Sequence, residues 1–335
     1  MIGLDIAKNV FEVHGRDAAG TVVVRRSLKR GQMEKFFTKL PKAVIGLEAC
    51  GSSHHWARLL GKLGHEVRLM PPAYVKPYVK RNKSDAIDAA ACWEAMGRPD
   101  MRFVPVKTVD QQAALSLHRS RDLLVSQRTQ LANALRALLS EFGIVAGTGK
   151  AGLAQLIDGL RAGTLELPRD AVASATVLAD QHAALNAAAD TLKQRIAAQA
   201  RADKKTAMLQ TAPGVGPLTA HATLATMPDP SLFKSGRQFA AWLGLTPSIT
   251  GTGGKTRTGR ITRQGNQLLR RLLVLGATAL LRYLRANPEK ASPWLRGLMD
   301  RRPAKVVAVA QAARTARILW AMLTHNQPYR APAVG

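Results

Sequence analysis

Cysteine is nearly absent from this sequence, and its scarcity excludes several classes of protein. Two cysteines, Cys50 and Cys92, occur among 335 residues. Because they fall in different predicted elements, the chain has neither a disulfide framework nor a metal site built from cysteine alone, and we expect both to be reduced thiols.

Long apolar runs are also lacking. No stretch reaches the roughly 18 apolar residues that a membrane-spanning helix needs. The first residues predict a strand that contains an acid, which is not the pattern of a signal peptide. We therefore expect a cytoplasmic protein with no membrane partner.

Acidic residues are few compared with basic ones. The chain has 22 Asp and Glu against 49 Lys and Arg, which gives a formal net charge of +27. A surface this basic binds a polyanion, and nucleic acid is the first candidate. With 46% hydrophobic residues, the chain is long enough for two or three domains with their own cores.

Four of the few acids stand in unusual positions. Asp5 and Glu48 each lie in a short apolar run that predicts a buried strand, and Asp85 and Asp88 are three residues apart in a predicted helix, on one face of it. A buried carboxylate is unfavourable unless it is paired, hydrogen-bonded or bound to metal. Singly, each acid could be a salt-bridged core residue or part of a solvated helix face. Together, the four suit one or two Mg²⁺ ions, which prefer oxygen ligands, held for phosphodiester chemistry.

The order of elements around these acids predicts a fold. Patterning predicts three strands, then helix, strand, helix, strand and helix, with the acids on the first strand, the fourth strand and the last helix. This is the order of the ribonuclease H-like α/β fold. The predicted segments are 2–6, 10–13, 21–26, 31–40, 43–49, 53–63, 65–70 and the helix that carries Asp85 and Asp88.

The middle of the chain is predicted to be helical. Long Leu- and Ala-rich helices are expected over 108–142 and 170–201, with a shorter one over 152–160 between them. Near-heptad spacing in the helix over 170–201 indicates a coiled-coil arm that joins two subunits. The alternative is a helix that packs on its own domain.

A Pro-Gly-Val-Gly stretch lies between two helical segments within 209–220, a pattern typical of a helix-hairpin-helix element. Gly214 and Gly216 would let backbone N–H groups and a helix N-terminus meet a DNA phosphate. The alternative is a turn with a structural role only.

The segment 239–262 is rich in glycine and threonine, and we interpret it as a flexible loop that binds phosphates and presents hydroxyls that can attack phosphorus. A solvated basic linker is the alternative. The helices that follow are basic as well and are expected to hold nucleic acid. The cations singled out for this role are Lys255, Arg257, Arg260, Arg263, Arg270 and Arg271.

Several motifs, in order along nearly the whole chain, resemble the DEDD transposases of the IS110 insertion-sequence family, and the IS1111 subgroup in particular. They are GLDIAKNVFEVHG from Gly3, GLEACGS from Gly46, KSDAIDAA from Lys83, APGVGPLTA from Ala212, and FAAWLGLTP followed by GGKTRTGRITRQGN through Asn266.

The resemblance implies a RuvC-like N-terminal domain, similar to Holliday-junction resolvases, whose four acids bind Mg²⁺. It implies a recombinase that joins donor and target DNA chosen by a structured guide RNA, a bridge or seeker RNA, from the element itself. It also implies a homo-oligomer, dimer or tetramer, in which a serine hydroxyl of the C-terminal domain attacks DNA and forms a covalent phosphoserine link, in a composite site between subunits.

The sequence departs from the family where that serine is expected. Counting from Pro247 puts the nucleophile at Gly251 or Thr252. Three explanations follow: Thr252 is the nucleophile, Ser248 has taken its role, or this copy is impaired. We favour Thr252, although its β-methyl group crowds an in-line approach to phosphorus.

The expected organisation is a catalytic domain, a helical arm, a mainly helical C-terminal domain and a tail. Two other functions fit the charge equally well: a metal-dependent junction resolvase that uses water and forms no covalent link, and a catalytically silent nucleic-acid-binding protein. The expected boundaries are 1–106, 107–203, 204–326 and 327–335.

Overall fold

The computed structural model describes residues 1–79, 84–227 and 229–331. Lys83, the first residue of the KSDAIDAA motif, and residues 332–335 of the expected tail lie outside these ranges. The chain divides into two compact units, Met1–Val109 and Asp110–Gly335. The division into three domains and a tail stays a prediction.

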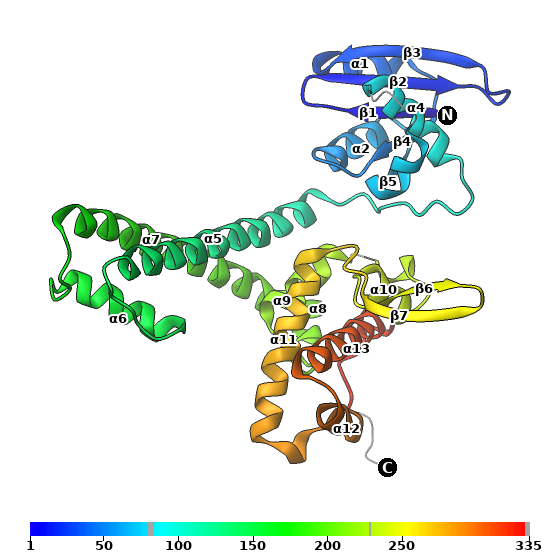
Figure 1. The fold of residues 1–335 in the computed structure, drawn as a ribbon. Helices are drawn as coiled ribbons and strands as arrows, with labels where there is room; N and C mark the ends of the chain where they lie inside the picture. Colours follow the sequence, from blue (N-terminus) through cyan, green and yellow to red (C-terminus); the bar gives the residue numbers. More distant parts are fainter. Residues whose placement is uncertain (80–83, 228, 332–335) are drawn as a thin grey trace. The chain divides into compact units, whose positions relative to one another are not determined.

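The first unit is built on a five-stranded sheet with the strand order β3-β2-β1-β4-β5 (Figure 1). β1, β2 and β3 form an antiparallel meander, whereas β4 is parallel to β1 and β5 is parallel to β4. The five predicted strands are confirmed, and β2 and β3 are longer than expected. Their bounds are Ile2–Ile6, Val10–Arg16, Val22–Lys29, Val44–Glu48 and Glu66–Met70.

Helices cover both faces of this sheet because its central strands alternate between two sets of side chains. In β1, Ile2 and Leu4 belong to the core beneath helices α1 (Met33–Lys39) and α2 (Ser53–Lys62). Gly3 and Asp5 point to the other face, which helix α4 (Asp85–Met96) covers. A short helix α3 (Pro72–Val75) precedes α4.

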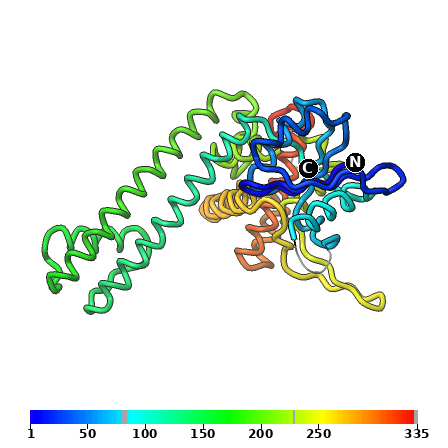
Figure 2. The backbone as a smooth tube through the Cα atoms, turned by 90° about the horizontal axis from the view of Figure 1, so that it is seen from above, coloured from blue at the N-terminus to red at the C-terminus, as the bar shows by residue number. Residues whose placement is uncertain are grey.

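The second unit begins with a helical hairpin. α5 (Val109–Ser140) and α7 (Arg169–Ala202) run side by side, and α6 (Gly149–Arg161) lies between them in the chain (Figures 1 and 2). Leucines of α5 and α6 and alanines of α7 form a core of their own, and Arg128 Nη1 donates to Asn186 Oδ1 at 2.6 Å. The predicted helices are confirmed; a coiled coil between subunits stays a prediction.

The rest of the unit is a helical domain around α13 (Ala304–His325). This helix is long and apolar enough to cross a membrane by length and composition alone. Its apolar side chains pack in the core with those of α10 and α11, among them Ala312 and Leu319, both fully buried. The other helices are α8 (Lys204–Leu209), α9 (Pro217–Thr226), α10 (Gly236–Trp242), α11 (Gln267–Ala286) and α12 (Pro293–Arg301).

The prediction of a flexible loop over 239–262 is wrong. The segment completes α10 and then forms a two-stranded antiparallel hairpin of β6 (Pro247–Thr252) and β7 (Lys255–Ile261), drawn in yellow in Figure 1. Gly253 and Gly254 form the turn with φ of 56° and 76°. A Gly-Gly pair with positive φ is a typical two-residue hairpin turn, and the alternating threonines favour strands.

Candidate active site

The position of helix α4 on the sheet depends on two glycines that face each other across neighbouring strands. Gly3 of β1 is the register partner of Gly46 of β4. A Cβ atom on Gly3 would lie 2.0 Å from the carbonyl oxygen of Ala89, and one on Gly46 would lie 2.8 Å from Sδ of Met96. No larger residue fits at these contacts, so the glycines allow α4 to pack directly on the backbone of both strands.

This packing brings three of the predicted acids together. Asp5 follows Gly3 by two residues and so lies on the same face of the sheet, at the carboxyl end of β1. Asp85 and Asp88 occupy the first turn of α4, next to Ala89. Carboxylate oxygens of these three aspartates all lie within 4.8 Å of one another.

Glu48 ends β4 on the strand next to Asp5, two residues beyond Gly46. It lies outside the group of three whose oxygens are mutually close, but its charge acts on Asp5. The fourth predicted acid is therefore at the same edge of the sheet.

Burial and the charges of the neighbouring acids both act on Asp5. Burial, followed by the charges of Asp88, Asp85 and Glu48, raises the pKa of Asp5 from 3.8 to about 6. A group of carboxylates in this state has the donor chemistry of a divalent cation site, because a bound cation would remove the repulsion and oxygen is the ligand that Mg²⁺ prefers. The residues present fit a magnesium site.

Both cysteines lie close to these acids. Cys50 and Cys92 are free. Burial, then the charges of Glu48 and Asp5, raises the pKa of each thiol above its ordinary value. Both sulfurs are therefore protonated at neutral pH, which favours an oxygen-ligated hard cation over a thiolate-ligated soft one.

One further acid near this cluster was not singled out from the sequence. Glu12 of β2 is the register partner of Asp5 and is half-buried on the same face of the sheet. The signal was present in the alternation of β2, where Phe11 and Val13 are buried in the opposite core. An antiparallel register was needed to see that Glu12 stands beside Asp5.

The hairpin in the second unit presents hydroxyl groups and cations on one face. Thr250 is the register partner of Arg257, and Thr252 is the partner of Lys255. Directly opposed residues of an antiparallel pair project to the same side, so these four side chains share a face. All four are exposed, and Thr250 was not singled out from the sequence.

The two other positions considered for the nucleophile are placed differently. Gly251 has no hydroxyl and is the register partner of Thr256. Ser248 Oγ donates to the carbonyl oxygen of Arg260 at 3.1 Å, and a Cβ on Gly259 would lie 2.6 Å from that Oγ. The serine hydroxyl is thus held against the opposite strand near the base of the hairpin.

The remaining basic residues fall into two groups. Arg260 is exposed on β7, like Lys255 and Arg257. Arg270 Nη1 instead donates to the carbonyl oxygens of Leu243, at 2.8 Å, and Gln264, at 2.6 Å.

Arg263 and Arg271 differ, since the side chain of Arg263 is exposed whereas that of Arg271 has a structural partner. Arg263 has a φ of 57°, and its backbone N–H donates to Gly244 O at 3.2 Å. Arg271 forms an ion pair with Asp122 of α5. Nucleic-acid binding by these side chains and by Arg270 stays a prediction.

The two glycines of the Pro-Gly-Val-Gly turn have different surroundings. Gly214, with a φ of 78°, packs against α11, where a Cβ would lie 3.0 Å from the carbonyl oxygen of Gly276. Gly216 is exposed and precedes the first residue of α9. Close packing accounts for Gly214, whereas Gly216 is the one that lies at an open helix N-terminus.

Comparison with known proteins gives consistent matches along the chain. Residues 2–144 match the sequence model of a family described as transposase, of the DEDD IS110 type, and residues 206–293 match that of the transposase IS116/IS110/IS902 family.

Individual relatives match over almost the full length. A probable family 20 transposase of Pseudomonas aeruginosa is 47% identical over 98% of this chain and 98% of its own. A Sinorhizobium fredii protein, y4pF/y4sB, is 48% identical over 98% of this chain and 85% of its own. The transposase for insertion sequence element IS1111A of Coxiella burnetii is 38% identical over 99% of this chain and 92% of its own.

Proposed function

Because the chain belongs to the family of transposases encoded by IS110-type insertion sequences, we propose that it cuts, covalently holds and rejoins the DNA strands of such an element. The family makes DNA its partner and recombination its reaction. The steps below concern how this chain performs that reaction.

The observation that carries the proposal is the approach of three carboxylates within 4.8 Å of one another at the edge of the sheet. Asp5, Asp85 and Asp88, with Glu48 beside them, would hold Mg²⁺. Bound there, Mg²⁺ would supply charge neutralisation at the scissile phosphodiester and stabilise the oxygen that leaves. The acids position the cation and, through it, the DNA backbone.

The hydroxyl of Thr252 is the proposed nucleophile. Its Oγ1 loses its proton and forms a bond to phosphorus, the bond from phosphorus to the sugar oxygen breaks, and that oxygen gains a proton. The product is a phosphothreonine link, which a sugar hydroxyl of another strand reverses when it attacks the same phosphorus. Lys255 and Arg257, which share the face of Thr252, would stabilise the charge on the phosphate oxygens.

The partners we propose are donor DNA, target DNA and a structured guide RNA from the element, bound by a dimer or tetramer. The net charge of +27 supports polyanionic partners. Exposed Lys255, Arg257, Arg260 and Gly216 are the contacts we favour for phosphates. The guide RNA, the oligomer and the cytoplasmic location rest on resemblance to the family.

A recombination assay tests this function. Purified protein, Mg²⁺, the flanking transcript of the element and supercoiled donor and target plasmids are incubated and resolved on denaturing gels for protein–DNA adducts. We expect RNA-dependent adducts that disappear with Asp85→Asn and Thr252→Ala. Thr252→Ser retains a hydroxyl without the β-methyl group, so it should keep the adduct and form it at least as fast.

The other outcomes identify the alternatives. Adducts that survive Thr252→Ala would move the nucleophile to Thr250 or Ser248, which Thr250→Ala and Ser248→Ala then distinguish. Cleavage that needs Mg²⁺ but leaves no adduct indicates a hydrolytic resolvase. Activities that are all unchanged in Asp85→Asn would indicate that the acids are structural.

A further inference from the structure

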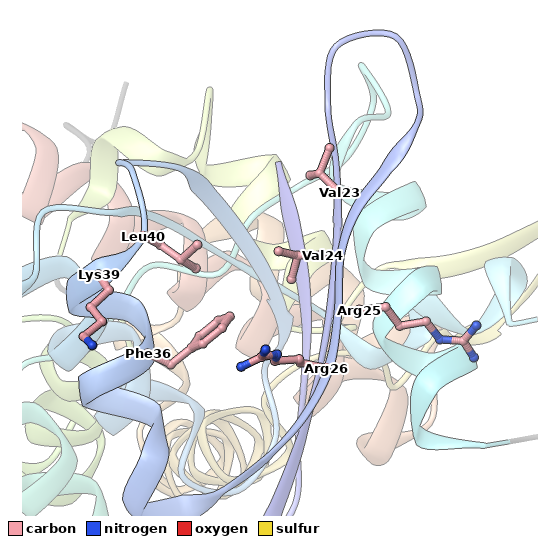
Figure 3. Close-up of a pocket in the computed structure, with 7 residues that line it drawn as sticks. All are labelled: Val23, Val24, Arg25, Arg26, Phe36, Lys39 and Leu40. Atoms are coloured by element: carbon pink, nitrogen blue, oxygen red, sulfur yellow. The ribbon is translucent and has the colours of Figure 1, made fainter.

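A hollow lies between the edge strand β3 and helix α1, on the face of the sheet opposite α4 (Figure 3). Its volume is about 420 Å³, within the range of roughly 300–1,000 Å³ found for small-molecule sites. The residues that line it are Val23, Val24, Arg25, Arg26, Phe36, Lys39 and Leu40.

The chemistry of this hollow combines an aromatic floor with a cationic rim. Phe36 and Lys39 are three residues apart on α1, so they share one face of that helix, and Leu40, which directly follows α1, also lines the hollow. On β3, Val24 and Arg26 alternate toward the same side as buried Leu28. Figure 3 shows Arg26 and Lys39 on either side of the Phe36 ring. None of the lining residues is acidic.

The ring of Phe36 packs against a buried aromatic neighbour. It makes an edge-to-face contact with Phe37, with centroids 5.2 Å apart and planes at 89°, and Phe37 is fully buried. Phe36 itself is half-buried, so part of its ring is accessible. An accessible aromatic ring between two cations is a platform on which a flat ligand with a negative charge can stack.

We propose that this hollow binds one unpaired nucleotide of a nucleic-acid strand, with the base stacked on Phe36 and the phosphate between Arg26 and Lys39. Stacking requires a free base face, which a nucleotide within a duplex does not offer. The net charge of +27 draws a polyanion to the protein. The competing explanation is that the cations only keep an edge strand from pairing with other chains.

The structure supplies a matched control for this proposal. Arg25 also borders the hollow, is adjacent to Arg26 in β3, is exposed like Arg26, and carries the same charge. Its side chain extends to the opposite side of the strand, away from the Phe36 ring (Figure 3). If the cations only keep β3 from pairing with other chains, Arg25 and Arg26 should matter equally. If the hollow binds a nucleotide, binding should depend on Arg26 and not on Arg25.

The experiment uses the full chain in EDTA, so that its result does not depend on the proposed strand transfer. Single-stranded 12-mers with one 5-iodouracil are crosslinked by light, and the crosslinked peptide is identified by mass spectrometry. Affinity is measured by fluorescence anisotropy over a series of salt concentrations. We expect crosslinks to Phe36, in ribo- or deoxyribo-oligomers, and the stronger of the two identifies the preferred sugar.

The variants separate the proposal from general charge. Phe36→Leu retains most of the buried volume and should weaken binding about 5- to 100-fold. Arg26→Ser and Lys39→Ser should each reduce the slope of log affinity against log salt by about 0.7, and Arg25→Ser should leave it unchanged. Thermal denaturation of each variant establishes that it is folded.

Three results would overturn the proposal. They are equal losses of affinity from Arg25→Ser and Arg26→Ser, an equal loss of affinity from Phe36→Leu for a blunt duplex and for a single strand, and crosslinks confined to peptides outside residues 22–40.

Discussion

Asp5 links the candidate metal site to stability. In the folded state its pKa is raised from 3.8 to about 6, mainly by burial and then by the charges of its neighbours. Between these values the folded state retains a proton that the unfolded state has lost. Stability that is present below pH 4 is therefore lost as pH rises to about 6, and a bound cation would restore it.

We predict that Mg²⁺ raises the melting temperature of the protein more at pH 8 than at pH 5, because only the ionised acids repel one another. Differential scanning fluorimetry with Mg²⁺ or EDTA measures the effect. Asp5→Asn should remove both the pH dependence and the magnesium shift, whereas Glu34→Gln, at an exposed acid of α1 in the same unit, should retain them. Equal magnesium shifts at the two pH values would contradict the assignment.

Gly3 is a second residue that determines the geometry of the candidate site, because it lacks a Cβ atom. Gly3→Ala places a methyl group 2.0 Å from the Ala89 carbonyl oxygen, so α4 must move away from β1. We predict destabilisation of about 1–3 kcal/mol, as for other overpacked sites, together with loss of the magnesium shift. Chemical denaturation measures the first and fluorimetry the second.

Gly31→Ala is the control for this substitution, since a Cβ at Gly31 has nothing within 4 Å. If Gly3→Ala were as stable as Gly31→Ala and kept its magnesium response, the close packing of α4 on β1 would not be what sets the site.

Among the individual residues of the candidate site, the sequence identifies the acids but not all of their neighbours. Asp5 and Glu48 could be predicted because each interrupts a short apolar run, and Asp85 and Asp88 because their spacing puts them on one helix face. Glu12 could not be singled out, since an acid in an alternating strand is ordinary until its register partner is known.

The hairpin β6–β7 is an element that the residue pattern of the sequence did not predict. The glycines and threonines of this segment fit a loop by composition, yet two of the four glycines of the hairpin form its turn and the threonines alternate along the strands. No apolar face marks either strand, because both strands are exposed along nearly their whole length. Hydrophobic periodicity, the main signal for strands, has nothing to detect in such a hairpin.

A histidine pair joins two helices of the second unit. His118 of α5 is buried, and its Nε2 lies 2.9 Å from Nδ1 of His221 on α9. Burial, then the charges of His221 and Arg121, lowers the pKa of His118 from 6.5 to about 4. Asp203 acts in the opposite direction on His221, but burial still lowers the pKa of that histidine.

We predict that this contact makes the second unit less stable in acid. Between pH 6.5 and 4 the unfolded state binds protons that the folded state does not, so stability that is present above pH 6.5 is lost as pH falls to about 4. His118→Gln should flatten this dependence in thermal denaturation at pH 7 and pH 5. His325→Gln, at an exposed helix end, should leave it unchanged, and an identical profile for both variants would contradict the role of the pair.

In the molecule as a whole, the four acids and Thr252, the proposed nucleophile, belong to different compact units. If the composite site implied by the family forms between subunits, two inactive variants should complement each other. We predict that mixing Asp85→Asn with Thr252→Ala, neither of which forms adducts alone, restores adduct formation to a fraction of the wild-type level. Gel analysis of the mixture measures this, and no restoration at any ratio would place both parts of the reaction within one chain.

The architecture of the first unit was predictable as a whole, because the order of its elements and the positions of its acids agree with a single fold. The three helices α5, α6 and α7 of the second unit were predictable from length and apolar spacing. What the sequence left open depends on contacts between distant residues, such as Gly214 against Gly276 and Asp122 against Arg271. Such contacts leave no local pattern.

Because Gly3 pairs with Gly46, the acid site forms only when β1 is in its correct register. Side chains alternate along a strand, so a slip of β1 by one residue would put Leu4 or Ile2 where α4 needs a glycine and would turn Asp5 to the opposite face. A sheet with β1 out of register would then lose both the close packing of α4 on the two strands and the carboxylate cluster. If the acids bind a divalent cation as proposed, binding of that cation would report correct strand alignment.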